Sequence, residues 1–344
     1  MSCCDETTAR VPPTDLSRRS ILKGAAVVAS VLPGAAPAAG QGRRIKLAYC
    51  SQLLCGVPYE VARSAGHFKK HGLDVELVYT RGGNAAMSAL VGNAVEYAAT
   101  SLDVAITAFT KGGGIKRFAV TGRLPLFALA TAPKTASQIK SVGDLQGRTV
   151  AVSGLGNGDH ALALYLLALA KADSSKVKFA TMGVNLLEAL RQGQVDAGMV
   201  QEPALTLLQR SGARVLVNGM DLTDARRYLG GTYEFMGVAV RTKDMEQRKD
   251  EMVTLTKALA DALKALRTMS GAELIGALPK EMVTGLDTKE FGETIVRYRD
   301  SLYPEAVTID LAAAERVAQS LIAGGLLKPG ASIAGLHDTS IAGS

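Results

Sequence analysis

The segment SALVGNAVEYA at residues 88–98 is repeated in outline by EALRQGQVDAG at residues 188–198. In each copy a helical pattern ends in Ala-Leu, a glycine suited to a helix C-terminus follows, and Val plus an acidic residue open an apolar run. We therefore expect two lobes, each containing the same helix-to-strand unit.

Short apolar runs continue on both sides of these copies, and helical patterns separate most of them. The runs are 45–49, 74–79, 95–99, 117–121, 149–152, 178–181, 196–200 and 214–217. Because they are continuously apolar rather than alternating, they predict mostly parallel sheets covered by helices on both faces, that is, an α/β protein. Amphipathic patterns at 249–269, 289–302 and 311–323 predict helices that pack on the first lobe.

Three stretches of the sequence predict two passages between the lobes. The stretches 126–131 and 137–148 would carry the chain out, and the strand-like 236–241 would bring it back. Two such crossings are what hinge closure around a ligand requires. We expect residues 44–133 and 235–334 to form lobe 1 and residues 134–234 to form lobe 2. Residues 335–344 would be a flexible C-terminal tail.

The N-terminal segment predicts export. SRRSILK at 17–23 contains a twin arginine, the address of a route for folded proteins. The uncharged run at 24–39 is shorter than the about 20 residues of a lasting membrane span, and APA at 36–38 offers small residues to a signal peptidase. Residues 1–38 are therefore expected to be a twin-arginine signal peptide, cleaved near Ala38, and the mature protein to be periplasmic.

Composition excludes several classes of partner. The net charge is +7, but Lys and Arg are scattered without interleaved aromatic residues, which argues against nucleic acid and leaves small anions as ligands. Trp is absent and aromatic residues make up only 5% of the chain, so few faces could stack on sugars or bases.

Neither the cysteines nor the histidines predict a metal site or a cofactor. Cys50 and Cys55 are the only cysteines that remain after the signal, and the sequence leaves open whether they form a disulfide or stay as thiols. His67 and His71 have the i, i+4 spacing of a metal pair, but no Glu follows as in metalloprotease helices. A solvated helix C-terminus explains the pair better.

Helix starts after strands are the candidate binding elements. GLGNG at 154–158 follows a strand and opens a helix, but Asp159 stands where a dinucleotide fingerprint needs its third glycine. Such a turn presents backbone N–H groups to a small ligand. Residues 80–84 and 100–103 repeat the arrangement, so three helix N-termini are expected at one sheet edge. Gly-x-Ser-x-Gly is absent and no catalytic set is recognisable, so the chain is not expected to be an enzyme.

Three motifs in this order resemble a known family: ARSAGHFKKHGLDVE at 62–76, VGDLQGRTVAVSG at 142–154 and VDAGMVQEP at 195–203. The sequence is similar to substrate-binding proteins of nitrate, sulfonate and taurine-type ABC importers, a family that includes binders of thiamine pyrimidine precursors. The resemblance spans Arg44 to Leu327 and implies a two-lobed type II periplasmic binding protein. By position, its ligand loops correspond to Ser51, Gln52, Gly83, Asn84, Ser101, Leu102, Asn157, Asp159, His160, Gln201, Glu202 and Pro203.

The resemblance also implies partners and a ligand class. The protein would be a monomer that captures a small organic anion, of the sulfonate, taurine, nitrate or carboxylate class, and delivers it to an inner-membrane permease and its ATPase. The Trp that the family often places before Glu-Pro is missing here; Tyr59, Tyr233 and Phe235 are the aromatic residues that could replace it. Binding or synthesis of a thiamine pyrimidine precursor, and ligand sensing for a membrane receptor, remain alternatives.

Overall fold

A computed structural model describes residues 44–50 and 53–343, which belong to one compact unit, Gly42–Ser344. The predicted signal peptide and the candidate ligand residues Ser51 and Gln52 lie outside the described residues. Within the described ranges, none of the helices is both long and apolar enough to cross a membrane.

The first sheet has the order β2-β1-β3-β10-β4. Its strands are β1 (Ile45–Cys50), β2 (Val75–Thr80), β3 (Tyr97–Ser101), β4 (Ile115–Val120) and β10 (Met236–Arg241). β1 pairs in parallel with β2 and β3, whereas β10 runs antiparallel to both β3 and β4. All residues of the central strands β3 and β10 are buried, which explains why their sequences are apolar or small up to Arg241 at the end of β10.

The second sheet repeats this plan in the order β7-β6-β8-β5-β9. Its strands are β5 (Ala128–Thr131), β6 (Thr149–Val152), β7 (Lys178–Thr181), β8 (Ala197–Val200) and β9 (Val215–Asn218). β6 pairs in parallel with β7 and β8, and β5 runs antiparallel to β8 and β9. The two copies of the repeated segment end in β3 and β8, which hold equivalent places in the two sheets.

Each sheet contains one strand, β10 or β5, that runs antiparallel to both of its neighbours, which the sequence pattern did not predict. Residues 126–131 were expected to be part of a loop-and-turn crossing, but Ala128–Thr131 form β5 and pair inside the second sheet. β5 therefore joins the second sheet although the predicted division placed residues up to 133 in lobe 1. The division itself, 44–133 and 235–334 against 134–234, stays a prediction.

The two crossings of the chain run side by side. Thr121 N–H and Gly122 N–H donate to the Met236 carbonyl at 2.8 and 3.1 Å, and Phe235 N–H donates to the Gly122 carbonyl at 2.9 Å. Tyr233 N–H donates to the Arg123 carbonyl at 2.9 Å. Each crossing leads directly into the antiparallel strand of the sheet that it enters.

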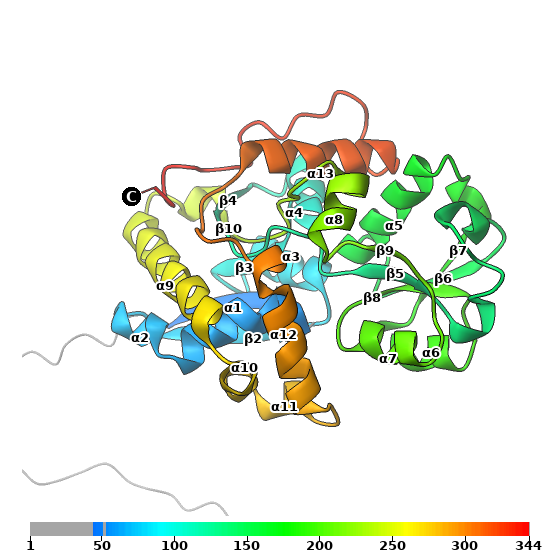
Figure 1. Ribbon diagram of the computed structural model, residues 1–344. Helices are drawn as coiled ribbons and strands as arrows, with labels where there is room; N and C mark the ends of the chain where they lie inside the picture. The colour runs from blue at the N-terminus through cyan, green and yellow to red at the C-terminus, as the bar shows by residue number, and fades with distance from the viewer. Residues whose placement is uncertain (1–43, 51–52, 344) are drawn as a thin grey trace, which may run out of the picture. The chain divides into compact units, whose positions relative to one another are not determined.

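Helices cover the sheets, as Figure 1 shows. They are α1 (Leu53–Ser64), α2 (His67–Lys70), α3 (Gly83–Val91), α4 (Leu102–Thr110), α5 (Gly158–Leu169), α6 (Leu186–Arg191), α7 (Ala204–Arg210), α8 (Leu222–Asp224), α9 (Lys249–Thr268), α10 (Gly271–Ala277), α11 (Lys280–Val283), α12 (Thr288–Leu302) and α13 (Leu311–Ala323). Of the three predicted late helices, α9 packs on α1 and α2, and α12 on α10 and α9. α13 packs on both α4 and α5, and so touches helices of both sheets (Figure 1).

The C-terminal segment packs against the first sheet. Arg117 N–H of β4 donates to the Leu336 carbonyl, and Asp338 N–H donates to the Arg117 carbonyl, both at 2.8 Å. Leu336 and Ile341 are buried in the core. The predicted flexible tail at 335–344 therefore contributes core residues.

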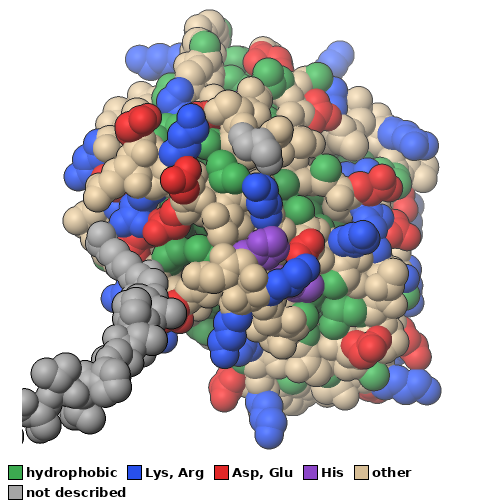
Figure 2. All heavy atoms as spheres, turned by 90° about the vertical axis from the view of Figure 1, so that its left-hand side faces the viewer, with side chains coloured by type: hydrophobic (Ala, Val, Ile, Leu, Met, Phe, Trp, Pro, Cys, Tyr) green, Lys and Arg blue, Asp and Glu red, His purple; other side chains and the backbone are tan. Residues whose placement is uncertain are grey.

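The surface that carries α2 and α9 mixes charges of both signs. Figure 2 shows Lys and Arg interspersed with Asp and Glu on this face, with histidine side chains among them. His71 Nε2 lies 3.0 Å from Asp261 Oδ2, and Lys70 Nζ lies 2.8 Å from the same oxygen. Among the described residues there is no group of three or more His, Cys, Asp or Glu that could hold a metal ion.

Candidate functional site

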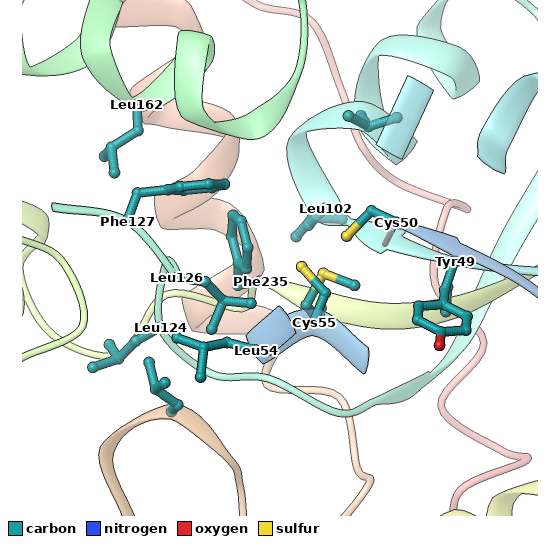
Figure 3. Close-up of a cluster of buried hydrophobic side chains, with 14 of the residues drawn as sticks. Tyr49, Cys50, Leu54, Cys55, Leu102, Leu124, Leu126, Phe127, Leu162 and Phe235 are labelled. Atoms are coloured by element: carbon teal, nitrogen blue, oxygen red, sulfur yellow. The ribbon is translucent and has the colours of Figure 1, made fainter. Parts of the chain in front are cut away.

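A small cavity of about 20 Å³ lies where the carboxyl ends of strands from both sheets meet. The residues that line it are Cys50, Cys55, Gly82, Gly83, Ser101, Phe127, Ser153, Asn157, Gly158, Asp159, Phe235 and Met236. Of these residues, Cys50 to Ser101 and also Met236 come from the first sheet and its helices. Ser153 to Asp159 come from the end of β6 and the start of the helix that follows it in the second sheet. Figure 3 shows Phe127 and Phe235 on one side of this region and Cys50 and Cys55 on the other.

Three helices begin at the cavity wall. Gly82 precedes α3, Ser101 precedes α4 and Asn157 precedes α5, and all three residues line the cavity. The first N–H groups of a helix have no intrahelical acceptor, and the helix dipole places partial positive charge there. The cavity is thus surrounded by backbone donors from both sheets.

The side chains of Asn84 and Asn157 join the two sheets across the cavity. Asn157 Oδ1 accepts a hydrogen bond from Asn84 N–H at 3.3 Å, and Asn84 Nδ2 donates to the Leu155 carbonyl at 3.4 Å. Asn157 Nδ2 donates to Ser153 Oγ at 3.1 Å. The Asn157 amide oxygen therefore occupies one of the helix-start donors of α3.

Two glycines permit this close approach. A Cβ on Gly82, whose φ is +127°, would lie 2.8 Å from Asn157 Nδ2. A Cβ on Gly158 would lie 3.0 Å from Ser101 Oγ and 3.2 Å from Asp103 Oδ1. Larger side chains at either position would push the two walls apart.

Two buried carboxylates stand at the cavity. Asp159 Oδ1 accepts from Ser153 Oγ at 2.9 Å, and its Oδ2 accepts from Ser153 N–H, so Asp159 closes the turn before α5. Asp103 lies behind Gly158, and neither of its oxygens meets a donor at full hydrogen-bond geometry in the described part of the chain. Burial raises the pKa of both Asp103 and Asp159 to about 6; a nearby Ser101 hydroxyl partly offsets this for Asp103.

The buried guanidinium of Arg117 holds the backbone next to the cavity by hydrogen bonds. It donates to the carbonyls of Thr100 and Phe235, both adjacent to lining residues, at 3.3 to 3.4 Å. Glu234 Oε1 lies 3.3 Å from Arg117 Nη2 and 3.4 Å from His337 Nε2 of the C-terminal segment. Burial lowers the pKa of Arg117, and Glu234 opposes that effect.

The structure places the predicted site residues in two groups. Gly83, Ser101, Asn157 and Asp159 line the cavity, Asn84 reaches across it, and Leu102 is buried beside it (Figure 3). His160, Gln201, Glu202 and Pro203 are not among the lining residues. Ser51 and Gln52 lie outside the described residues.

The second group has other packing partners. His160 Nδ1 accepts from Gly156 N–H at 3.1 Å, its ring packs edge-on against Phe179, and burial lowers its pKa. Glu202 accepts from Thr206 N–H at 3.0 Å and Thr206 Oγ1 at 3.1 Å, and so caps α7. Gln201 reaches the first lobe instead, where its side chain hydrogen-bonds the Cys55 thiol.

Sequence reasoning missed Phe127, Ser153 and Met236 in the cavity wall. Phe127 and Met236 border the strands that follow the crossings, and Ser153 follows β6 directly. The rule that ligands meet the ends of strands would have selected Ser153. Phe235 was expected only as a substitute aromatic face.

The fold defined by these two sheets is that of periplasmic binding proteins. A Candida albicans protein whose structure is described as having the generic periplasmic binding protein fold matches with a TM-score of 0.65 and 16% identity, over 84% of this chain and 92% of that one. A Bordetella bronchiseptica RB50 protein matches with a TM-score of 0.79 and 23% identity, over 88% and 96%. The alkanesulfonate-binding protein SsuA of Xanthomonas axonopodis pv. citri, bound to MOPS, matches with a TM-score of 0.67 and 19% identity, over 87% and 99%.

A family profile identifies the chain more narrowly. The profile described as NMT1/THI5 like matches residues 57–268, more than half of the 344 residues. The chain belongs to this family. A search of curated proteins found no match.

Proposed function

We propose that this protein is the periplasmic substrate-binding component of an ABC importer, which captures a small molecule between two lobes and releases it to a permease. The convergence of three helix starts from both sheets on one cavity carries this proposal. The likeness to an alkanesulfonate-binding protein and the twin-arginine segment support it.

Closure and opening of the lobes would control access. The cavity of about 20 Å³ holds little more than one water-sized body. An organic ligand would therefore enter when the two sheets separate and the contacts between Asn84 and the 155–157 turn break.

The charges at the site bear on the ligand class. The small organic anion predicted from the sequence would be held by helix-start donors. However, the lining residues of the described chain include Asp159 and no Lys or Arg, and Asp103 lies directly behind them. These carboxylates favour a ligand that also presents hydrogen-bond donors, such as an amine or aminopyrimidine, over a simple anion like nitrate.

A thermal-shift screen of the purified mature protein tests both ligand classes. A ligand at about 100 times its Kd adds about 2.7 kcal/mol to stability. The buffer must be free of sulfonates, because the Xanthomonas protein was found with MOPS bound. Stabilisation by amines or pyrimidines but not by nitrate, sulfonates or carboxylates supports the donor-bearing ligand, and the reverse supports the anion.

Two further results would bear on the proposal. Asp103→Asn should abolish stabilisation by a donor-bearing ligand and spare or improve that by an anion. Turnover of a ligand by the purified protein, with released product, would contradict a binding role.

A further inference from the structure

The cavity wall carries a cluster of sulfur atoms that the proposed organic ligand does not explain. Cys50 ends β1, Cys55 lies in the first turn of α1, and Met236 begins β10; all three line the cavity. The structure has no disulfide between the two cysteines. Figure 3 shows the side chains of the two cysteines near each other, beside Leu102.

The two thiols are buried, and aromatic side chains form the wall opposite them. Cys50 and Cys55 are 4% and 3% exposed, and Phe127 and Phe235 form the opposite wall. A hard cation such as Ca²⁺ takes about six to eight oxygen ligands, whereas the side-chain oxygens of the wall come only from Ser101, Ser153, Asn157 and Asp159. The cavity volume of about 20 Å³ is suited to a single atom.

We propose that Cys50 and Cys55 form a binding site for one soft monovalent metal ion, Cu(I) in chemical class, with the Met236 thioether on the same wall. Thiolates and thioethers are the ligands that soft ions select. Zinc usually takes four ligands in a tetrahedron, and the described wall provides two thiols, no histidine and one carboxylate, Asp159, whose oxygens already accept from Ser153. Low coordination numbers are ordinary for Cu(I) and Ag(I).

The charge of the occupied site follows from the protons that the thiols release. Binding forms two metal–sulfur bonds, and each thiol gives its proton to solvent without any change of oxidation state. The product, one +1 ion with two thiolates, carries one negative charge. The starts of α3, α4 and α5 favour negative charge in the cavity, whereas Asp159 in its wall and Asp103 behind Gly158 oppose it.

Anaerobic titration with Ag(I), a redox-inert probe for Cu(I), tests this site. The full-length chain is used in a Cys3→Ser, Cys4→Ser background, so that Cys50 and Cys55 are its only cysteines. A thiol count on the denatured protein first establishes that both are reduced. Native mass spectrometry should show one tightly held Ag(I) per chain, and weakly buffered titration should show two protons released.

Variants distinguish the site from nonspecific binding to methionines. Cys50→Ser and Cys55→Ser should each weaken Ag(I) binding at least about tenfold. Met252→Leu, which removes a buried sulfur outside the cavity, should leave it unchanged. Melting curves verify that each variant is folded.

The opposite results would overturn the proposal. Equal Ag(I) affinity in the background protein and in folded Cys50→Ser, or one proton or none released, would show that the two thiols do not act together. The organic-ligand screen uses no metal, so its outcome is independent of this one.

Discussion

Replacement of Gly82 by Ala should separate the two walls of the cavity. The new Cβ would lie 2.8 Å from Asn157 Nδ2, closer than nonbonded atoms approach, so the Asn157 side chain must leave its place. It would then lose the hydrogen bond from Asn84 N–H and the one to Ser153 Oγ. At about 1 kcal/mol each, the loss is about 2 kcal/mol, or about 30-fold in an equilibrium between joined and separated walls.

Backbone strain at Gly82 needs its own control. Its φ of +127° disfavours any L side chain, which by itself costs about 1 to 3 kcal/mol. Gly231 has a similar φ of +134°, but a Cβ there meets only Arg316 atoms at 3.8 Å or more. Gly231→Ala therefore reproduces the strain without the contact across the cavity.

The assay compares the two variants by urea unfolding and by amide hydrogen exchange. Gly82→Ala should be about 2 kcal/mol less stable than Gly231→Ala. The Asn84 amide, which donates across the cavity, should exchange faster in Gly82→Ala alone. Equal stability and equal exchange at Asn84 in the two variants would refute the argument.

Three other predictions concern charge and export. Burial raises the pKa of Asp103 to about 6, above the unfolded value near 3.8, so the free energy of unfolding falls as Asp103 ionises between about pH 4 and pH 6. Asp103→Asn should therefore stabilise the protein by up to about 3 kcal/mol at pH 8 and hardly at pH 4. A pH-independent effect in urea unfolding would contradict this. Glu202→Ala should lower the free energy of unfolding by about 1 kcal/mol through loss of the hydrogen bonds from Thr206, whereas unchanged stability in urea would argue against the cap. Replacement of Arg18 and Arg19 by Lys should leave unprocessed protein in the cytoplasm, and normal periplasmic accumulation on immunoblots of cell fractions would disprove the export prediction.

Much of the fold could be predicted because its strands and helices have distinct patterns. The runs at 149–152 and 178–181 coincide with β6 and β7, and 311–323 coincides with α13. The direction of β5 could not be predicted in this way. A short buried strand is continuously apolar whether its neighbours are parallel or antiparallel, so its pairing depends on where the crossing delivers it.

The sequence predicted those site residues whose place at the cavity depends on the backbone alone. Gly83, Ser101 and Asn157 reach the cavity because helix starts after strands point to one edge of a sheet. The places of Glu202 and His160 depend instead on their side-chain partners. Glu202 accepts from Thr206 and His160 packs against Phe179, both away from the cavity. Such tertiary partners leave no local pattern in the sequence.

The position of β10 imposes an order on folding during synthesis. β10 lies between β3 and β4 and is the only described strand that joins them, so neither can complete its pairing before residues 236–241 leave the ribosome. The second sheet, by contrast, is encoded without interruption from Ala128 to Asn218. We therefore expect the second sheet to be finished first, and the first sheet to wait, with β3 and β4 incompletely paired, for β10, the last of the described strands to be made.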